Sequence, residues 1–145
     1  MIAKSDFDTS YLTFSIGHRS FGIPAISVLE INRNLEYTSV PNGPKFIRGI
    51  LNLRGQLIPA IDLRNFLGIE RVDNCRESVG IIVDIDSTKA SLLVDSVGDI
   101  IPLGGLTFEP PPVNFPLQSM RAIVGAHKLE NSLLVILEPK LLISE

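Results

Sequence analysis

Four aspartates come closest to a catalytic pattern in this sequence. Asp84 and Asp86 stand at the end of one apolar run, and Asp95 and Asp99 follow the next. Two carboxylates that share a proton can cleave peptide bonds, as in aspartic proteases. The loop that begins at Asp95, however, has Val97 where the protease loop has glycine, and no second loop of this kind exists. We therefore interpret these carboxylates as strand-end and turn residues, and a protease is a distant alternative.

The other reactive side chains form no recognisable site. His18 and His127 have no Cys or acidic residues at metal-ligand spacing, and Cys75 is the single cysteine. No serine lies in a G-x-S-x-G elbow. We expect no catalytic residues, no metal and no cofactor, and hence no enzyme. A lone cysteine also excludes an internal disulfide and is typical of a reducing cytoplasm.

Two arginines stand out because their surroundings are apolar. Arg48 and Arg54 lie within the string FIRGILNLRGQLIPAIDLR, and Gly49 and Gly55 directly follow them. An arginine is rarely buried without a partner, and its planar fork is favoured in contacts between proteins. Glu30, in the apolar segment upstream, would be a partner of opposite charge if it lies near. The pattern suggests a surface that meets another protein.

The elements that carry these residues are mostly strands. Apolar side chains recur at every second position, which is typical of half-buried strands. Residues 25–31 fit either a helical turn or a further strand. Strands are expected at residues 11–16, 21–23, 35–40, 47–53, 56–62, 79–84, 90–94, 97–102, 121–129 and 132–137. Short helices are expected at residues 63–67, capped by Asp62 and ended by Gly68, and at residues 139–143.

Composition narrows the class further. The chain has 145 residues, of which 45% are apolar and 20% charged, with a net charge of −3. The 13 Lys and Arg residues are scattered, so the basic face of a nucleic-acid binder is missing. No segment has the roughly 20 apolar residues of a membrane helix. The strand count indicates an all-β protein, and the charged, loop-like residues 70–77 form the expected boundary between two halves.

Several strings of this sequence resemble the CheW family of chemotaxis adaptor proteins. The most specific is VPNGPKFIRGILNLRGQLIPAIDLR, and YLTFSIGHRSFGIPAISVLEI and IIVDIDSTKASLLVDSVGDI also match. The resemblance implies two small SH3-like, five-stranded barrels that share an apolar core, with short helices. We expect residues 1–145 to be one such domain, with a first barrel at about residues 10–70, a second at about 76–137, and a short C-terminal helix.

The resemblance also implies a function without catalysis. Members of the family link the cytoplasmic tip of a chemoreceptor to the regulatory domain of a CheA-type histidine kinase, in the cytoplasm at membrane-bound receptor arrays. We expect both partners here, but no nucleic acid and no direct membrane insertion. The residues that match the family's receptor-binding groove are Val28, Glu30, Arg48, Gly49, Asn52, Arg54 and Val97. The kinase-binding residues are not assigned. The alternative is a sensor that binds a small ligand between the barrels.

Overall fold

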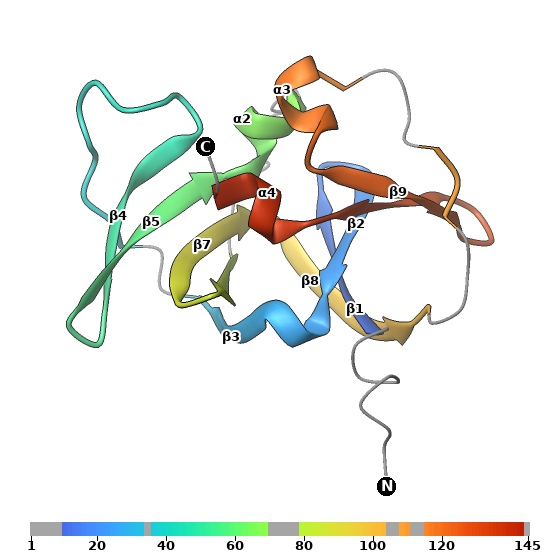
Figure 1. Cartoon of the computed structure of the whole chain (residues 1–145), viewed down its shortest axis with the longest axis horizontal. Helices are drawn as coiled ribbons and strands as arrows, with labels where there is room; N and C mark the ends of the chain where they lie inside the picture. Colours follow the sequence, from blue (N-terminus) through green and yellow to red (C-terminus); the bar gives the residue numbers. More distant parts are fainter. Residues whose placement is uncertain (1–9, 34–35, 70–78, 104–107, 111–114, 144–145) are drawn as a thin grey trace, which may run out of the picture.

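A computed structural model describes residues 10–33, 36–69, 79–103, 108–110 and 115–143 of the chain. Its strands form two five-stranded sheets, which lie side by side in Figure 1. In order across the first sheet, the strands are β8 (Ser96–Pro102), β1 (Ser10–Ile16), β2 (Arg19–Pro24), β10 (Leu133–Leu137) and β9 (Ile123–Lys128). In order across the second, they are β3 (Val28–Asn32), β6 (Val79–Ile85), β7 (Thr88–Val94), β5 (Gln56–Asp62) and β4 (Ile47–Leu53).

Short helices connect and cover the sheets. They are the 3-10 turn η1 (Ala25–Ser27), α2 (Leu63–Leu67), α3 (Leu117–Met120) and α4 (Pro139–Ile143). The Asp62 side chain accepts a hydrogen bond from the Asn65 N–H, and Gly68 ends α2 in the left-handed conformation at φ 69°. Both signals were read from the sequence, and both are confirmed. None of the described helices is long and apolar enough to cross a membrane.

The two sheets follow one plan that the sequence does not reveal. Each contains an antiparallel hairpin, β1–β2 or β6–β7, whose second strand pairs in parallel with β10 or β5. A short helix then follows both β10 and β5. The strand after each hairpin pairs in the other sheet, because β3 joins β6 and β8 joins β1.

This exchange corrects the expected barrel boundaries. Residues 10–70 do not form one sheet, because β1 and β2 belong to one sheet and β3, β4 and β5 to the other. Residues 76–137 are divided in the same way. Hydrophobic alternation places residues on a face but does not choose the strand's partner, so the division by sequence halves was wrong. Residues 70–78, with the expected boundary and Cys75, lie outside the described residues.

A shared core joins the sheets because many strands are apolar on both faces. On β6, Ile81 enters the large core between the sheets, whereas Ile82 packs in a small cluster of the second sheet. On β10, Val135 enters the same large core, whereas Leu134 packs in a cluster of the first sheet. This is the expected arrangement of two barrels with an apolar core in common, and it is confirmed.

Pro59 is accommodated on a strand inside the second sheet. Its strand, β5, lies between β4 and β7, where a missing backbone N–H would usually cost a ladder hydrogen bond. β5 pairs with β7 only through residues 60–62, however, so Pro59 lies outside that pairing.

The prediction of a strand at residues 35–40 is largely wrong. Residues 34 and 35 lie outside the described part of the chain. Among residues 36–40, only Thr38 forms a β-bridge, and its partner is Ile50.

Tyr11 gives the fold a dependence on alkaline pH. Burial raises the pKa of Tyr11 above 10.0, and the charge of Glu138 raises it further. The unfolded chain releases this proton near pH 10, so the contribution of neutral Tyr11 to stability is complete below that pH and is lost as the pH rises through the folded pKa. We expect wild type to lose stability relative to Tyr11→Phe as the pH rises above about 10, because only the folded state then keeps the Tyr11 proton. Urea unfolding of both proteins measures this, and parallel losses would contradict it.

Candidate functional site

The β4–β5 hairpin holds most of the predicted site. Arg54 and Gly55 form its turn with φ of 51° and 85°, which are the two left-handed positions of a tight hairpin turn. The Gly55 N–H donates to Asn52 Oδ1 at 2.9 Å. The hairpin projects from the second sheet at the lower left of Figure 1. The hydrogen bond between Gly55 and Asn52 therefore stabilises the turn, and Arg54 extends from a well-defined backbone conformation.

Arg54 binds Glu30, as the sequence suggested. Its Nη1 lies 2.6 Å from Glu30 Oε2, and its Nη2 donates to Oε1 at 3.4 Å. The hydrogen bond that Arg54 donates to Glu30, and then the charge of the carboxylate, raise the pKa of Arg54, so the guanidinium stays charged. Because β3 and β4 are opposite edge strands of the second sheet, the pair connects its two ends. The Arg54 side chain still has 73% of its surface exposed, so a partner can reach it.

Gly49 lets a second contact form along β4. Thr38 and Ile50 exchange two backbone hydrogen bonds, of 2.9 and 2.8 Å. A Cβ atom at position 49 would lie 2.4 Å from the Thr38 carbonyl oxygen. Only glycine allows this approach.

Replacement of Gly49 by alanine should therefore push the segment that carries Thr38 away from β4. We expect Gly49→Ala to lower the free energy of unfolding by about 1–3 kcal/mol, because backbone atoms must move to admit a methyl group. Urea denaturation measures the loss. Gly43→Ala is the matched control, because the nearest atom to a Cβ there lies at an ordinary 3.6 Å. Equal stability of the two variants would contradict this role for Gly49.

Arg48 is held by internal contacts. Its Nη2 forms a short ion pair with Asp62 Oδ2, and its Nη1 donates to the Tyr37 hydroxyl at 3.2 Å. Asp62 also caps α2 through its other oxygen. Arg48 thus ties β4 to the start of α2, and 30% of its side chain is exposed.

The seven predicted groove residues do not line one hollow. Val28 and Val97, on different sheets, are half-buried and pack against the shared core. Val97 lines a hollow of about 300 Å³ on the first sheet. Asn52 lines another, of about 600 Å³, with Tyr37, Thr38 and Leu57. The structure brings Glu30 and Arg54 together, while receptor binding by the set stays a prediction.

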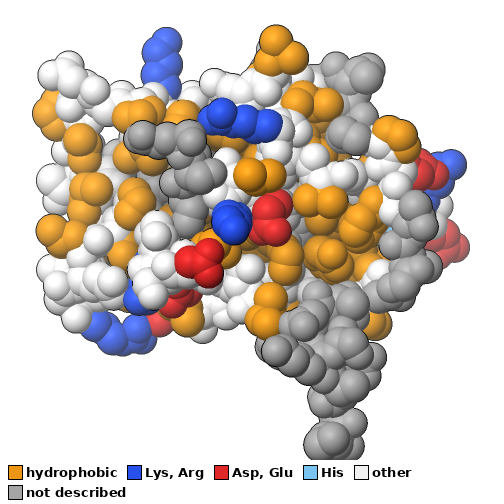
Figure 2. All heavy atoms as spheres, viewed as in Figure 1, with side chains coloured by type: hydrophobic (Ala, Val, Ile, Leu, Met, Phe, Trp, Pro, Cys, Tyr) orange, Lys and Arg blue, Asp and Glu red, His pale blue; other side chains and the backbone are white. Residues whose placement is uncertain are grey.

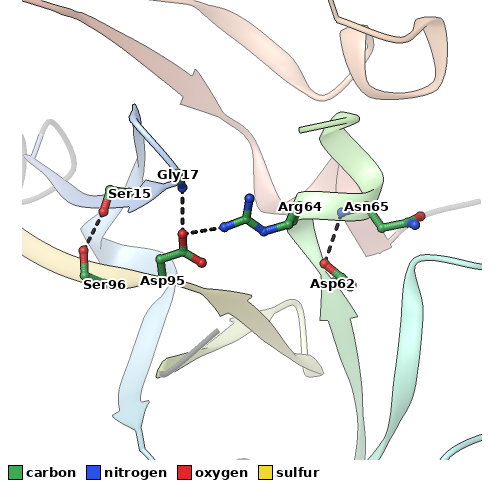
Figure 3. Close-up of polar contacts among 7 residues, drawn as sticks. All are labelled: Ser15, Gly17, Asp62, Arg64, Asn65, Asp95 and Ser96. Carbon is green, nitrogen blue, oxygen red and sulfur yellow. Dashed lines mark hydrogen bonds and ion pairs between the residues drawn. The ribbon is translucent and has the colours of Figure 1, made fainter. Parts of the chain in front are cut away.

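Sequence reasoning missed an ion pair between the two sheets. Arg64 Nη2, on α2, lies 2.5 Å from Asp95 Oδ2, and the same oxygen accepts the Gly17 N–H at 2.7 Å (Figure 3). The side chains of Arg64 and Asp95 are only 4% and 16% exposed. Gly17 belongs to the turn between β1 and β2, so the contact ties the first sheet to the helix that follows β5. The sequence did contain an indication of this buried arginine. Arg64 ends the string FIRGILNLRGQLIPAIDLR and lies beside the apolar residues Leu63 and Phe66 on the expected helix.

A second missed feature is the exposure of Leu57. Leu57 lies on an apolar strand, yet its side chain is 69% exposed. It pairs with Asn52 near the hairpin turn and borders the same hollow as Tyr37. The end of the hairpin therefore offers an accessible apolar side chain next to the hollow that Tyr37 and Asn52 line.

The candidate catalytic carboxylates have structural contacts. The Asp84 carboxylate accepts the Ser87 N–H in the β6–β7 turn, and Asp86 Oδ2 lies 3.9 Å from Lys140 Nζ. Asp99 is exposed on β8, where its backbone carbonyl oxygen accepts a hydrogen bond from the Thr13 hydroxyl. Asp95 is bound to Arg64. Across the described residues, no three His, Cys, Asp or Glu side chains gather closely enough to hold a metal ion. These contacts match the interpretation as strand-end and turn residues.

Comparison with known proteins matches residues 10–145 to the CheW-like domain. Chemotaxis protein CheW of Klebsiella aerogenes is 30% identical over 145 residues, which cover 99% of this chain and 87% of that protein. Protein PilI of Pseudomonas aeruginosa is 31% identical over 111 residues, which cover 75% and 62%. The crystal structure of scaffolding protein TtCheW from Thermoanaerobacter tengcongensis superposes with a TM-score of 0.76 at 34% identity, covering 90% of this chain and 88% of that chain.

The architecture of two five-stranded sheets over a common core, together with these matches, defines a chemotaxis-type scaffold domain. The chain belongs to the CheW family and is a coupling adaptor. These findings give no support to the alternative of a small-ligand sensor.

Proposed function

We propose that this protein is a non-catalytic adaptor that joins the cytoplasmic tip of a chemoreceptor to the regulatory domain of a CheA-type histidine kinase. The observation that carries the proposal is the match to the CheW-like domain over residues 10–145. The adaptor works in the cytoplasm, at membrane-bound receptor arrays. It raises the local concentration of kinase at the receptor tip, as a scaffold with two docking faces does.

The receptor contact is proposed to centre on the Arg54–Glu30 pair. Receptor tips in such assemblies are helical hairpins, and helices dock by placing apolar side chains into a trough with polar groups at its margin. Val28, next along β3, and Val97, on β8, are half-buried apolar side chains at the border of the shared core. They supply the apolar part of the contact, and the exposed guanidinium of Arg54 meets carbonyl or carboxylate oxygens of the receptor.

The kinase contact is proposed to lie on the other side of the same hairpin, around Leu57. This side chain is 69% exposed and adjoins a hollow of about 600 Å³ that Tyr37 and Ile50 also line. An apolar side chain on a rigid strand, next to an open hollow, is suited to a contact between proteins. Receptor and kinase would then bind neighbouring surfaces that meet at Asn52, a predicted receptor-groove residue that also lines this hollow.

Reconstitution from three purified components tests this assignment. We expect the adaptor, the receptor tip and the kinase regulatory domain to co-elute in size-exclusion chromatography as one complex. Leu57→Asn should weaken kinase binding about tenfold while receptor binding stays unchanged, because the lost contact is apolar and local. Val124→Asn is the control, since Val124 is 53% exposed on the other sheet. Kinase binding unaffected by Leu57→Asn would refute the assigned face, and failure of any ternary complex would refute the function.

A further inference from the structure

A separate apolar hollow lies at the end of the β4–β5 hairpin remote from Arg54. Its volume is about 540 Å³, within the range of sites that hold a ligand or a few side chains. Ile61, Phe66 and Leu142 form its buried floor, and half-buried Phe46 and Pro59 form its walls. β4, β5, α2 and α4 thus enclose it together. Figure 2 shows hydrophobic side chains spread over the β4–β5 side of the molecule.

Two cations border this hollow although the chain as a whole is acidic, with a net charge of −3. Arg121 is exposed and forms no ion pair with any described residue. Within the described part of the chain, Lys89 Nζ pairs with Asp84 Oδ2 at 3.9 Å, near the upper limit of an ion pair. An apolar floor with cations at its margin is complementary to a ligand that combines apolar groups with carboxylates.

We propose that this hollow docks a short acidic amphipathic peptide segment of a partner protein. One or two large apolar side chains of the segment occupy the space above Phe66 and Leu142, and its carboxylates lie beside Arg121 and Lys89. A lipid surface fits less well, because binding to anionic membranes uses clusters of several Lys and Arg residues, and among the described residues two cations line this site. The site is distinct from the Arg54–Glu30 pair and from Leu57, so the inference does not depend on the proposed function.

The test uses a fluorescein-labelled synthetic peptide in which Glu alternates with Leu and Phe at helical spacing. Fluorescence anisotropy with the full chain should show saturable binding that weakens as salt is added, because the rim contacts are ionic. The same peptide with Gln in place of Glu should bind several-fold more weakly. No binding of the acidic peptide up to about 1 mM, which corresponds to a negligible affinity, would overturn the proposal.

Two variants locate the binding. Arg121→Glu should weaken the acidic peptide about fivefold to tenfold, as reversal of one exposed charge does. Thr88→Trp, at the exposed margin, should weaken it at least about tenfold because the indole fills the hollow. Lys128→Glu is the charge control, since Lys128 is 76% exposed on β9 of the other sheet. Equal effects of Arg121→Glu and Lys128→Glu would show that the peptide binds elsewhere.

A variant that lacks residues 144 and 145 tests whether these residues, rather than a partner segment, occupy the hollow. The last two residues, Ser144 and Glu145, follow α4 and include a carboxylate. If the peptide binds the shortened chain and the full chain with the same affinity, the hollow accepts a partner segment as proposed. If the peptide binds only the shortened chain, residues 144 and 145 occupy the hollow in the longer chain, and the proposal of an external partner is wrong.

Discussion

Arg64→Ala is expected to destabilise this protein more than any other single substitution of a polar residue discussed above. Loss of the guanidinium removes the Arg64 ion pair from the Asp95 carboxylate, which is only 16% exposed. Removing one member of a buried ion pair costs about 3–5 kcal/mol. We expect a loss of that size in the free energy of unfolding, measured by urea denaturation with circular dichroism. The two sheets should also come apart more readily, because Arg64 connects α2 to the β1–β2 turn through Asp95.

A double variant separates the ion pair from simple packing. Arg64→Met combined with Asp95→Leu replaces both charges by apolar groups and should recover much of the lost stability, because both members of the ion pair are then removed together. Arg33→Ala is the control, since Arg33 is exposed after β3. A loss below about 1 kcal/mol for Arg64→Ala would show that the pair is as weak as an exposed one.

Arg54→Ala is expected to give the largest functional effect with an intact fold. The side chain is 73% exposed, so its removal should leave the thermal midpoint nearly unchanged. Receptor binding should fall by about fivefold or more, as for an arginine at the centre of a contact between proteins. Isothermal titration calorimetry with a purified receptor tip measures the change. Unchanged affinity would refute the role assigned to Arg54.

A charge exchange shows whether Arg54 acts on the receptor or on the barrel. Glu30→Arg combined with Arg54→Glu preserves opposite charges between β3 and the hairpin turn. If Arg54 contacts the receptor, the exchanged protein folds normally and still binds weakly. If the pair only connects the ends of the second sheet, the exchange restores binding, and the receptor-contact account of this residue is wrong.

Local structure could be predicted from this sequence because its signals are short-range. The strands expected at 47–53 and 56–62 leave Arg54 and Gly55 for a tight turn, which their backbone angles show, and the predicted cap of α2 by Asp62 is confirmed by its hydrogen bond. Arg54 also adopts a left-handed conformation, at φ 51°. This could not be predicted from the sequence, because residues other than glycine rarely adopt a positive φ. The all-β class followed from the number of expected strands, whereas the shared core was implied by the resemblance to the CheW family.

Strand partnership could not be predicted in the same way. β3 leaves the hairpin that precedes it and joins β6, and β8 joins β1 in exchange. A period-two pattern gives each strand a buried face but carries no information about its neighbour. Division at the charged segment 70–77 therefore produced boundaries that the sheets do not follow.

The candidate site was predictable where one residue type had one obvious partner. Glu30 and Arg54 have opposite charges in apolar surroundings, and they meet. Arg64 and Asp95 are 31 positions apart in sequence, and only the fold brings them together. The exposure of Leu57 was likewise hidden, because an apolar residue in an apolar strand gives no sign that the hairpin end projects from the sheet.

The most direct test of the central claim is an NMR titration of the isotope-labelled protein with a purified receptor tip. The account predicts that amide shifts concentrate on β3, on the β4–β5 turn around Arg54, and around Val97. Amides of β9 and β10 should barely move, since those strands hold none of the seven predicted groove residues. Shifts confined to β9 and β10, or no shifts at saturating receptor tip, would contradict it.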